Sequence, residues 1–269
     1  MALDNIGKNG DAAGMTYPGG KNGEGTYQRI INLMPPHETY IEPFLGSGAI
    51  LRMKRPAARN IGLDLDREVI AAWRATQLDR PSAKVARPDP RATEMRSQNR
   101  KLLPSLKLPG GPGHFEFAET DAIGYLISKQ LSARDLVYCD PPYPHSTRGR
   151  ADLYRHEMSD AQHRELLDVL LNLDCMVMIS GYWCPLYAEM LRGWNSIHYE
   201  AMTRAGHTAT EWLWFNFPVP VALHDYSYLG ENFRERERIK RKKLRWANRL
   251  KRMPLLEKRA LLAAIEAAA

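Results

Sequence analysis

A short apolar segment, residues 136–138, runs straight into Asp140-Pro141-Pro142-Tyr143, and this junction restricts the fold more than any other part of the chain. The segment has the composition of a buried strand, and two successive prolines cannot continue a central strand. The chain therefore leaves the sheet at this point. We expect Asp140 and Tyr143 at the carboxyl end of a strand, where open α/β sheets bind their ligands.

The motif offers three kinds of contact to a ligand. Asp140 has a carboxylate that accepts hydrogen bonds, the prolines have carbonyl groups but no N–H, and Tyr143 has a flat ring. Together these groups can accept both protons of an exocyclic amine and stack on the base that carries it. We therefore predict that Asp140, Pro141, Pro142 and Tyr143 are catalytic. The alternative is a rigid turn with an incidental aspartate.

A second motif lies upstream, where residues 39–51 have the pattern of a strand, a tight turn at Gly46-Ser47-Gly48 and a helix. A Gly-x-Gly turn between strand and helix lets a nucleoside-bearing ligand approach the N–H groups at the helix start. The third glycine of the dinucleotide fingerprint is absent, since Leu51 stands in its place, which disfavours phosphate binding. Glu42, just before the turn, suits a ligand with a cationic amino group.

Acidic residues follow the next two predicted strands. The strand at 60–63 ends at Asp64, about 20 residues after the glycine turn, where an acid can bind ribose hydroxyls. Asp66 is the alternative, but it can instead cap the helix expected over 68–77. A third strand at 115–118 is followed by Asp121.

The rest of the chain continues this alternation of strands and helices, which predicts a three-layer α/β domain. Further helices are expected over 27–34, 122–131 and 159–173, and further strands over 175–180, 197–202 and 211–217. His163, in the amphipathic helix over 159–173, is predicted to lie on the surface.

Composition divides the chain into segments. Residues 1–15 are polar and rich in Gly and Asn, which indicates a flexible lead-in. The stretch 78–113 holds six prolines and eight Lys/Arg against three Asp/Glu, and it is too long for a plain connection. It is predicted to be a short basic insertion in a domain over 16–228, either a solvated loop or an arm that touches nucleic acid.

The last segment, 229–269, carries most of the positive charge. It holds 13 Lys/Arg against 5 Glu, a surplus of 8, whereas the whole chain has a net charge of +7. A cationic helical tail on a near-neutral body indicates a polyanionic partner, nucleic acid before membrane, although a merely solvated helix is the alternative. The predicted nucleic-acid contacts are Lys240, Arg241, Lys242, Lys243, Arg245, Trp246 and Arg249 in the tail, and Arg148, Arg150 and Arg155 in the loop after the Asp140 motif.

Cysteine usage and hydropathy indicate the compartment. The three cysteines form no CxxC pair, which argues against a zinc site and a disulfide framework and fits a reducing cytoplasm. No apolar run approaches the ~20 residues that span a bilayer, and the first 15 residues have no signal-peptide hydrophobic region. We therefore expect a cytoplasmic protein with no membrane partner and no metal.

Three motifs together resemble the Dam-type DNA adenine N6-methyltransferases. They are Tyr17-Pro18-Gly19-Gly20-Lys21, Glu42-Pro43-Phe44-Leu45-Gly46-Ser47-Gly48 and Asp140-Pro141-Pro142-Tyr143, in the order of the α-ordered group. The resemblance covers about residues 15 to 217. It implies a Rossmann-like class I fold that binds S-adenosylmethionine (SAM), with a mostly parallel sheet, an antiparallel last strand and helices on both faces.

The resemblance also implies roles for individual residues. Asp140 and the Pro141 carbonyl would accept the two N6–H bonds of a flipped adenine, and Tyr143 would stack on it. Asp64 would hold the cofactor ribose, and Asp121 would lie near its adenine. The remaining residues expected around the cofactor are Tyr17, Gly19, Gly20, Lys21, Glu42, Pro43, Phe44, Gly46, Ser47 and Gly48.

The region over 78–113 departs from the family, because members that recognise a defined site carry a larger helical lobe there. We therefore expect a short or relaxed recognition sequence on double-stranded DNA. The same fold acting on cytosine N4, an RNA adenine or a protein glutamine is an alternative, although Asp140 favours adenine. A catalytically silent nucleic-acid-binding protein of this fold is a further alternative.

Overall fold

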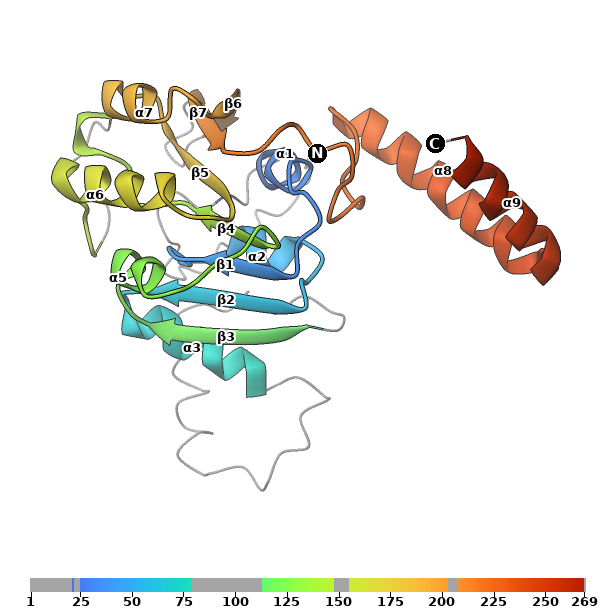
Figure 1. Ribbon diagram of the computed structural model, residues 1–269, viewed down its shortest axis with the longest axis horizontal. Helices are drawn as coiled ribbons and strands as arrows, with labels where there is room; N and C mark the ends of the chain where they lie inside the picture. The colour runs from blue at the N-terminus through green and yellow to red at the C-terminus, as the bar shows by residue number, and fades with distance from the viewer. Residues whose placement is uncertain (1–20, 22–24, 79–112, 148–154, 203–207, 269) are drawn as a thin grey trace, which may run out of the picture.

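The described part of the chain folds around a single seven-stranded sheet. The computed structural model describes Lys21 and residues 25–78, 113–147, 155–202 and 208–268. The strand order is β3-β2-β1-β4-β5-β7-β6 (Figure 1). Strands β1 to β5 pair in parallel, and β7 runs antiparallel to both β5 and β6. This confirms the predicted Rossmann-like α/β fold with an antiparallel last strand.

The predicted strands and helices agree with the observed ones to within a few residues, whereas the short helix Pro185–Met190 and the 3₁₀ turn His145–Thr147 were not predicted. The strands are β1 (Thr39–Glu42), β2 (Arg59–Asp64), β3 (His114–Glu119), β4 (Asp135–Cys139), β5 (Met176–Tyr182), β6 (Asn195–Met202) and β7 (Thr208–Phe215). The helices are α1 (Thr26–Ile31), α2 (Ala49–Met53), α3 (Arg67–Leu78), α5 (Ala122–Ile127), α6 (Asp160–Leu171), α7 (Pro185–Met190), α8 (Phe233–Arg252) and α9 (Leu255–Ala267), with a 3₁₀ turn η1 (His145–Thr147).

Helices cover both faces of the sheet and bury two apolar clusters. On one face, α1, α2 and α3 contribute Ile30, Ile50 and Trp73 to a cluster that includes Tyr138 of β4. On the other face, α5, α6 and α7 pack against the side chains of β4 and β5 that point the opposite way, since successive residues of a strand alternate between faces. The described core is thus a three-layer sandwich.

The strand order reverses between β1 and β4, and this creates the site of interest. These two strands pair in parallel, with Thr39 opposite Asp135 and Ile41 opposite Val137. The chain leaves β1 toward α2 on one face and leaves β4 toward the other half of the sheet. In open α/β sheets, ligands bind in the crevice outside the carboxyl ends of the strands at such a switch point.

Helix α6 begins as the sequence predicts, but one of its side chains is differently placed. Ser159 and Gln162 form a capping box at its start. His163 was expected on the surface, and that prediction is wrong, because its side chain is fully buried with Nδ1 3.1 Å from the hydroxyl of Tyr187. His163 shares one helical face with Leu166, Leu167 and Leu170, so it lies on the apolar stripe that packs against α7 and the sheet.

The basic tail forms a helical hairpin at the end of the sheet remote from the Asp140 motif. The backbone N–H of His224 donates to the carbonyl of Met34, and the hydroxyl of Tyr228 donates to the carbonyl of Met53. Both acceptors precede a strand, so the segment leading into α8 lies against the amino ends of the strands. Helices α8 and α9 project outward from there (Figure 1), with no buried residue in either.

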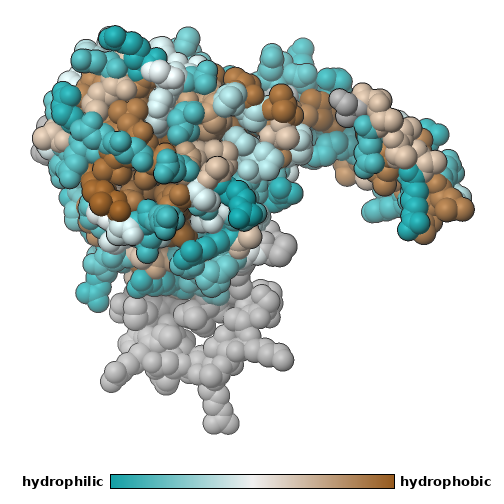
Figure 2. All heavy atoms as spheres, in the orientation of Figure 1, coloured by the Kyte–Doolittle hydropathy of each residue, from teal (hydrophilic) through white to brown (hydrophobic). Residues whose placement is uncertain are grey.

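The surface of this hairpin is chemically mixed. Figure 2 shows hydrophilic and hydrophobic side chains beside one another along it. Leu244 and Trp246 of α8 are about half exposed, and Leu256 and Ile265 of α9 are more so.

No helix in the described part of the chain is long and apolar enough to cross a membrane. Residues 1–15 and nearly all of 78–113 lie outside the described residues, so the proposed domain limits stay predictions.

Candidate functional site

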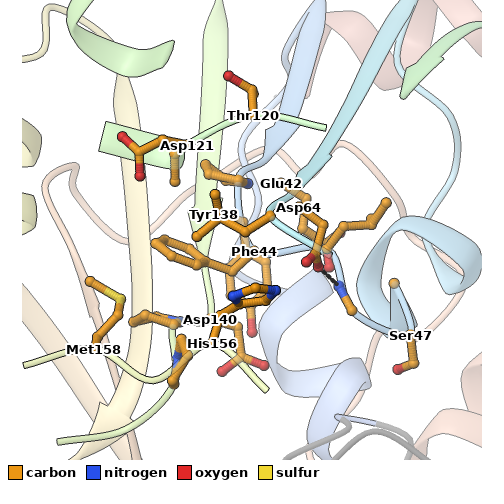
Figure 3. A pocket seen from close by; sticks show the side chains of 18 of the residues that line it. Glu42, Phe44, Ser47, Asp64, Thr120, Asp121, Tyr138, Asp140, His156 and Met158 are labelled. Atoms are coloured by element: carbon orange, nitrogen blue, oxygen red, sulfur yellow. Dashed lines mark hydrogen bonds between the residues drawn. The ribbon is translucent and has the colours of Figure 1, made fainter. Parts of the chain in front are cut away.

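A cavity of about 1070 Å³, counting its solvent-filled mouth, opens at the carboxyl ends of β1, β2, β3 and β4. Each of these strands contributes the residue that ends it or the loop that follows it. Figure 3 shows Glu42, Asp64, Asp121 and Asp140 around this cavity, together with the ring of Phe44. Two motifs that are almost 100 residues apart in sequence therefore line the same cavity, as the sequence predicts.

The glycine turn has the backbone conformation that its composition predicts. Gly46 and Gly48 have φ values of 44° and 55°, a left-handed conformation that is costly for other residues. A Cβ on Gly48 would overlap the ring of Trp73, and the Nε1 of Trp73 donates a 3.1 Å hydrogen bond to the carbonyl of Gly46. The turn thus leaves room for close approach of a ligand to the backbone while Trp73 supports its other side.

The structure separates the roles of the two aspartates after β2. Asp64 lines the cavity, and its carboxylate accepts 2.8 Å hydrogen bonds from the N–H groups of Gly46 and Asp66. Burial raises the pKa of Asp64, and these two hydrogen bonds oppose the rise. Asp66 instead accepts from the N–H of Glu68 at the start of α3, as the helix-cap alternative predicts. Asp64 is therefore the acid that a ligand in the cavity can reach.

Glu42 is a buried acid at the base of the cavity. Its Oε2 accepts hydrogen bonds from the hydroxyl of Tyr40 at 2.8 Å and from the N–H of Leu51 at 3.1 Å. Burial raises the pKa of Glu42 to about 8. A neutral carboxyl in an unliganded pocket ionises readily when a cation arrives, so Glu42 suits a positively charged ligand.

Asp140 lies at the edge of the cavity in a cluster of charged and hydroxyl groups. The Nζ of Lys21 lies 2.8 Å from Asp140 Oδ1 and 3.4 Å from Glu211 Oε2. Burial alone would lower the pKa of Lys21, but the two carboxylates overcome this effect and raise it. Burial also raises the pKa of Asp140, and Lys21 opposes that rise. Asp140 Oδ2 has no hydrogen bond from the described residues.

The ring of Tyr143, which is expected to stack on a flipped base, is buried in this structure. Only 3% of its surface is exposed, and its ring packs edge-on against Tyr182 with the centroids 4.6 Å apart. Its hydroxyl donates to Glu211 at 2.7 Å and is itself a partner of Lys21. The ring is covered because β5 and β7 close over it, so in this conformation it offers no face to a base.

The other predicted site residues divide into three groups. Pro43, Phe44, Ser47, Asp121, Pro141 and Pro142 line the cavity, as do Lys21 and Arg155. Arg155 was predicted to contact nucleic acid, but its guanidinium lies 3.1 Å from Asp66 and 3.0 Å from Glu68, where it ties the loop after β4 to the start of α3. Tyr17, Gly19, Gly20, Arg148 and Arg150 lie outside the described residues.

The predicted contacts in α8 lie far from this cavity. Residues 240–249 belong to the hairpin at the amino ends of the strands, whereas the cavity is at the carboxyl ends (Figure 1). Trp246 is about half exposed, with the guanidinium of Arg249 5.4 Å from its ring centroid. A role for the tail in binding nucleic acid therefore stays a prediction, and it concerns a surface separate from the cavity.

Sequence reasoning missed Glu211 and several cavity residues. Glu211 is a buried carboxylate within the otherwise apolar end of β7, and an acid among aromatic strand residues is the signal that could have found it. Thr120, Met158 and Gln162 line the cavity from loops and a helix start with no recognisable motif. Only the tertiary arrangement identifies them.

The three cysteines are all buried in the core. Cys139, Cys175 and Cys184 are buried free thiols, and burial raises the pKa of each. A buried thiol with a raised pKa is a poor nucleophile. The described residues hold no group of three or more His, Cys, Asp or Glu side chains that could bind a metal ion.

Comparisons with known proteins give similarity in three-dimensional structure only. No protein-family model and no curated protein matches the chain. Similar solved structures include precorrin 8W decarboxylase from Methanobacterium thermoautotrophicum, at 14% identity and a TM-score of 0.40, covering 75% of this chain and 94% of that one. The N-methyltransferase NodS from Bradyrhizobium japonicum WM9 has 12% identity and a TM-score of 0.38, with 71% and 94% covered.

Magnesium protoporphyrin IX methyltransferase (ChlM) from Synechocystis PCC 6803, solved with bound SAM, has 11% identity and a TM-score of 0.36, with 71% of this chain and 75% of that one covered. TM-scores of this size carry no argument about activity.

Proposed function

We propose that this chain is a SAM-dependent methyltransferase that modifies the N6 amino group of adenine in double-stranded DNA. One observation carries the proposal. Asp140 and Pro141 line the same cavity as the Gly46-Ser47-Gly48 turn, and the described residues donate no hydrogen bond to Asp140 Oδ2. An acceptor pair for an amine and a cradle for a nucleoside-bearing cofactor thus share one space.

The residues of the cavity fit SAM. The glycine turn admits the cofactor body, Asp64 is positioned for the ribose hydroxyls, and Glu42 can ionise opposite a positive charge. The adenine end would lie between Asp121 and an apolar wall. That wall consists of Phe44, Leu65, Ile123 and Met158. Bound there, SAM supplies an electrophilic methyl group on a sulfonium.

Asp140 and Pro141 orient the acceptor nitrogen in this proposal. Lys21 and Tyr143 both contact Asp140 Oδ1, so Oδ2 remains to accept one amino proton while the Pro141 carbonyl accepts the other. With both N–H bonds directed at these acceptors, the lone pair of the nitrogen points out of their plane toward the cavity. Positioning of this kind supplies much of the rate in a direct displacement.

The target base has to leave the duplex to reach Asp140, because Asp140 and Pro141 line a cavity formed by the loops after β1, β2, β3 and β4. Tyr143 would stack on the flipped base only after its ring is uncovered, since Tyr182 now packs against it.

The expected short or relaxed sequence specificity depends on residues 78–113, and the proposed backbone contacts of the tail add affinity without sequence information.

The experiment is a transfer assay with tritiated SAM and four acceptors: double-stranded DNA, DNA without adenine, RNA and a protein extract. We expect label only in adenine-containing DNA, at N6. Asp140→Ala should lower transfer by more than about a thousandfold while SAM binding changes little, because Asp140 positions the acceptor and not the cofactor. Label in RNA or protein would move the activity to that acceptor, and no label in any of the four would favour a silent nucleic-acid-binding protein.

A further inference from the structure

We propose that Glu211 of β7 is a positioning residue for the Asp140 motif. It holds Lys21 and Tyr143 at Asp140 Oδ1, so that Oδ2, to which the described residues donate no hydrogen bond, can accept from the amine and Lys21 does not neutralise Asp140 alone. The identity of the amine that benefits rests on the proposed function. The contacts themselves do not.

Glu211 binds both groups that contact Asp140 Oδ1. Its Oε2 lies 3.4 Å from Lys21 Nζ and accepts a 2.7 Å hydrogen bond from the hydroxyl of Tyr143. Lys21 Nζ in turn donates to Asp140 Oδ1 at 2.8 Å, and the Tyr143 hydroxyl lies 3.3 Å from the same oxygen. The four side chains form a closed ring, and Glu211 lies on the opposite side of it from Asp140.

The position of Glu211 is a costly one for an acid. It lies in a central strand, opposite Tyr182 of β5 and Tyr199 of β6, and only 8% of its surface is exposed. On the same face of β7, the next inward residues are Leu213 and Phe215, both in the apolar core. Burying a carboxylate is unfavourable unless it is paired, and an apolar residue would cost less. Glu211 is paired with Lys21 and Tyr143, so its contribution at this position comes through these two partners and not through apolar packing.

That contribution is charge. Lys21 and Asp140 alone would form a neutral pair, and a neutralised carboxylate is a weaker hydrogen-bond acceptor. Glu211 places a second acid beside Lys21, so that Lys21 is shared between two acids and does not neutralise Asp140 alone. A negative charge at Asp140 favours the positive charge that develops on the nitrogen as it gains a methyl group.

Two neighbouring charged groups shift the pKa of Asp140 in opposite directions. Among the groups that act on it, Glu211 raises the pKa of Asp140 and Lys21 lowers it. Removing the charge of Glu211 therefore leaves Lys21 unopposed and lowers the pKa of Asp140. Among the described residues, Asp140 also raises the pKa of groups on neighbouring elements: Glu42, Tyr138, Tyr143, Tyr182, Tyr187, Tyr199 and Cys139.

The test compares Glu211→Gln with Glu200→Gln in the full chain. Glu200 is an exposed acid on the adjacent strand β6, where it accepts a hydrogen bond from Thr210, so it provides the same chemical change in the same sheet. The pKa of Asp140 is measured by NMR of ¹³C-labelled aspartate, and the steady-state constants are measured with DNA. For Glu211→Gln we expect a lower Asp140 pKa and a kcat at least about tenfold lower, with a KM for SAM within about threefold of wild type. Glu200→Gln should match wild type in the Asp140 pKa, in kcat and in the KM for SAM.

An unchanged Asp140 pKa in Glu211→Gln, or a kcat equal to that of Glu200→Gln, would overturn the proposal. If Glu211→Gln does not fold, Glu211→Asp keeps the charge but withdraws it from Lys21. It should lower kcat and the Asp140 pKa by smaller amounts, and wild-type values in that variant would also overturn the proposal. The NMR measurement needs no substrate, so a pKa change without any methyl transfer would support the role of Glu211 while contradicting the proposed function.

Discussion

The indole Nε1 of Trp73 donates a 3.1 Å hydrogen bond to the carbonyl oxygen of Gly46. A residue of α3 thus supports the turn that follows β1, and its ring fills the space beside Gly48. Because both glycines are left-handed and Trp73 occupies the only side on which a side chain would extend, the turn tolerates no Cβ at Gly48.

Gly48→Ala should therefore weaken both the fold and cofactor binding. We expect a loss of about 1–3 kcal/mol in the free energy of unfolding, from backbone strain and overlap with Trp73, and at least about a tenfold loss in SAM affinity. Chemical denaturation and calorimetric titration measure the two effects. Gly193→Ala is the control, since a Cβ at Gly193 meets nothing within 4 Å. Equal behaviour of the two variants would contradict the close packing of the turn.

The raised pKa of Glu42 predicts a pH-dependent affinity for a cationic ligand. The free protein has Glu42 largely neutral below pH 8, and a cation favours its ionised form. SAM affinity should therefore fall by up to about tenfold for each pH unit below 8, and binding of SAM should release the proton of Glu42. Titration calorimetry in buffers of different ionisation enthalpy measures the number of protons released on binding. Glu42→Gln should bind more weakly at pH 8 and lose most of the pH dependence.

The same group affects the stability of the unliganded protein in the opposite sense. A folded-state pKa of about 8 against an ordinary value of 4.5 means that the folded chain binds more protons than the unfolded chain between these values. The contribution of Glu42 to stability is thus fully present below pH 4.5 and is lost as the pH rises through 8. Denaturation of wild type and Glu42→Gln across this range should show the wild type losing more stability on the alkaline side. Parallel curves would exclude Glu42 as the cause.

A stripe of arginines along α8 predicts which face of the tail binds DNA. Spacings of three and four residues place these side chains on one face of the helix: Arg234, Arg238, Arg241, Arg245, Arg249 and Arg252. Changing Arg241, Arg245 and Arg249 together to Gln should reduce the slope of log affinity against log salt by about 3, if each neutralises one phosphate.

The control is a triple change of Lys240, Lys243 and Lys251 to Gln, which removes the same charge from another face of α8. It should reduce the slope by less than the arginine variant. Identical slopes in the two variants would mean that total charge matters and the stripe does not. Wild-type slopes in both would remove α8 from DNA binding, a result compatible with its distance from the cavity.

His163 is expected to stabilise the fold without a role in the cavity chemistry. Its side chain is buried on the apolar face of α6 against Tyr187. His163→Ala should lower the free energy of unfolding by about 2–4 kcal/mol, because it leaves a cavity and removes a partner of the Tyr187 hydroxyl. Glu165→Ala, at an exposed position of the same helix, should change stability by less than about 0.5 kcal/mol. A destabilisation no larger than that control would contradict the packing role.

The local sequence was sufficient to predict the strands, the turns and the side of the cavity that the glycine turn and Asp64 form. Two prolines after β4 end a strand wherever they occur, and glycines at 46 and 48 allow the left-handed turn after β1. Asp64 is the last residue of β2, and parallel strands bring their carboxyl ends together. These features depend on the backbone preferences of a few neighbouring residues, so they can be predicted from the chain alone.

Only the tertiary structure determined the remaining features of the site and the place of the tail, because these features depend on pairs of residues that are distant in sequence. Glu211 reaches Tyr143 across 68 residues only because β7 inserts between β5 and β6. The same insertion covers the ring of Tyr143, and the packing of α6 against α7 buries His163. The tail is basic by composition, but its position at the amino ends of the strands follows from contacts such as the hydrogen bond of Tyr228 to Met53, the last residue of α2. Such contacts are determined by the assembled sheet, since no local preference of the residues involved specifies their partners.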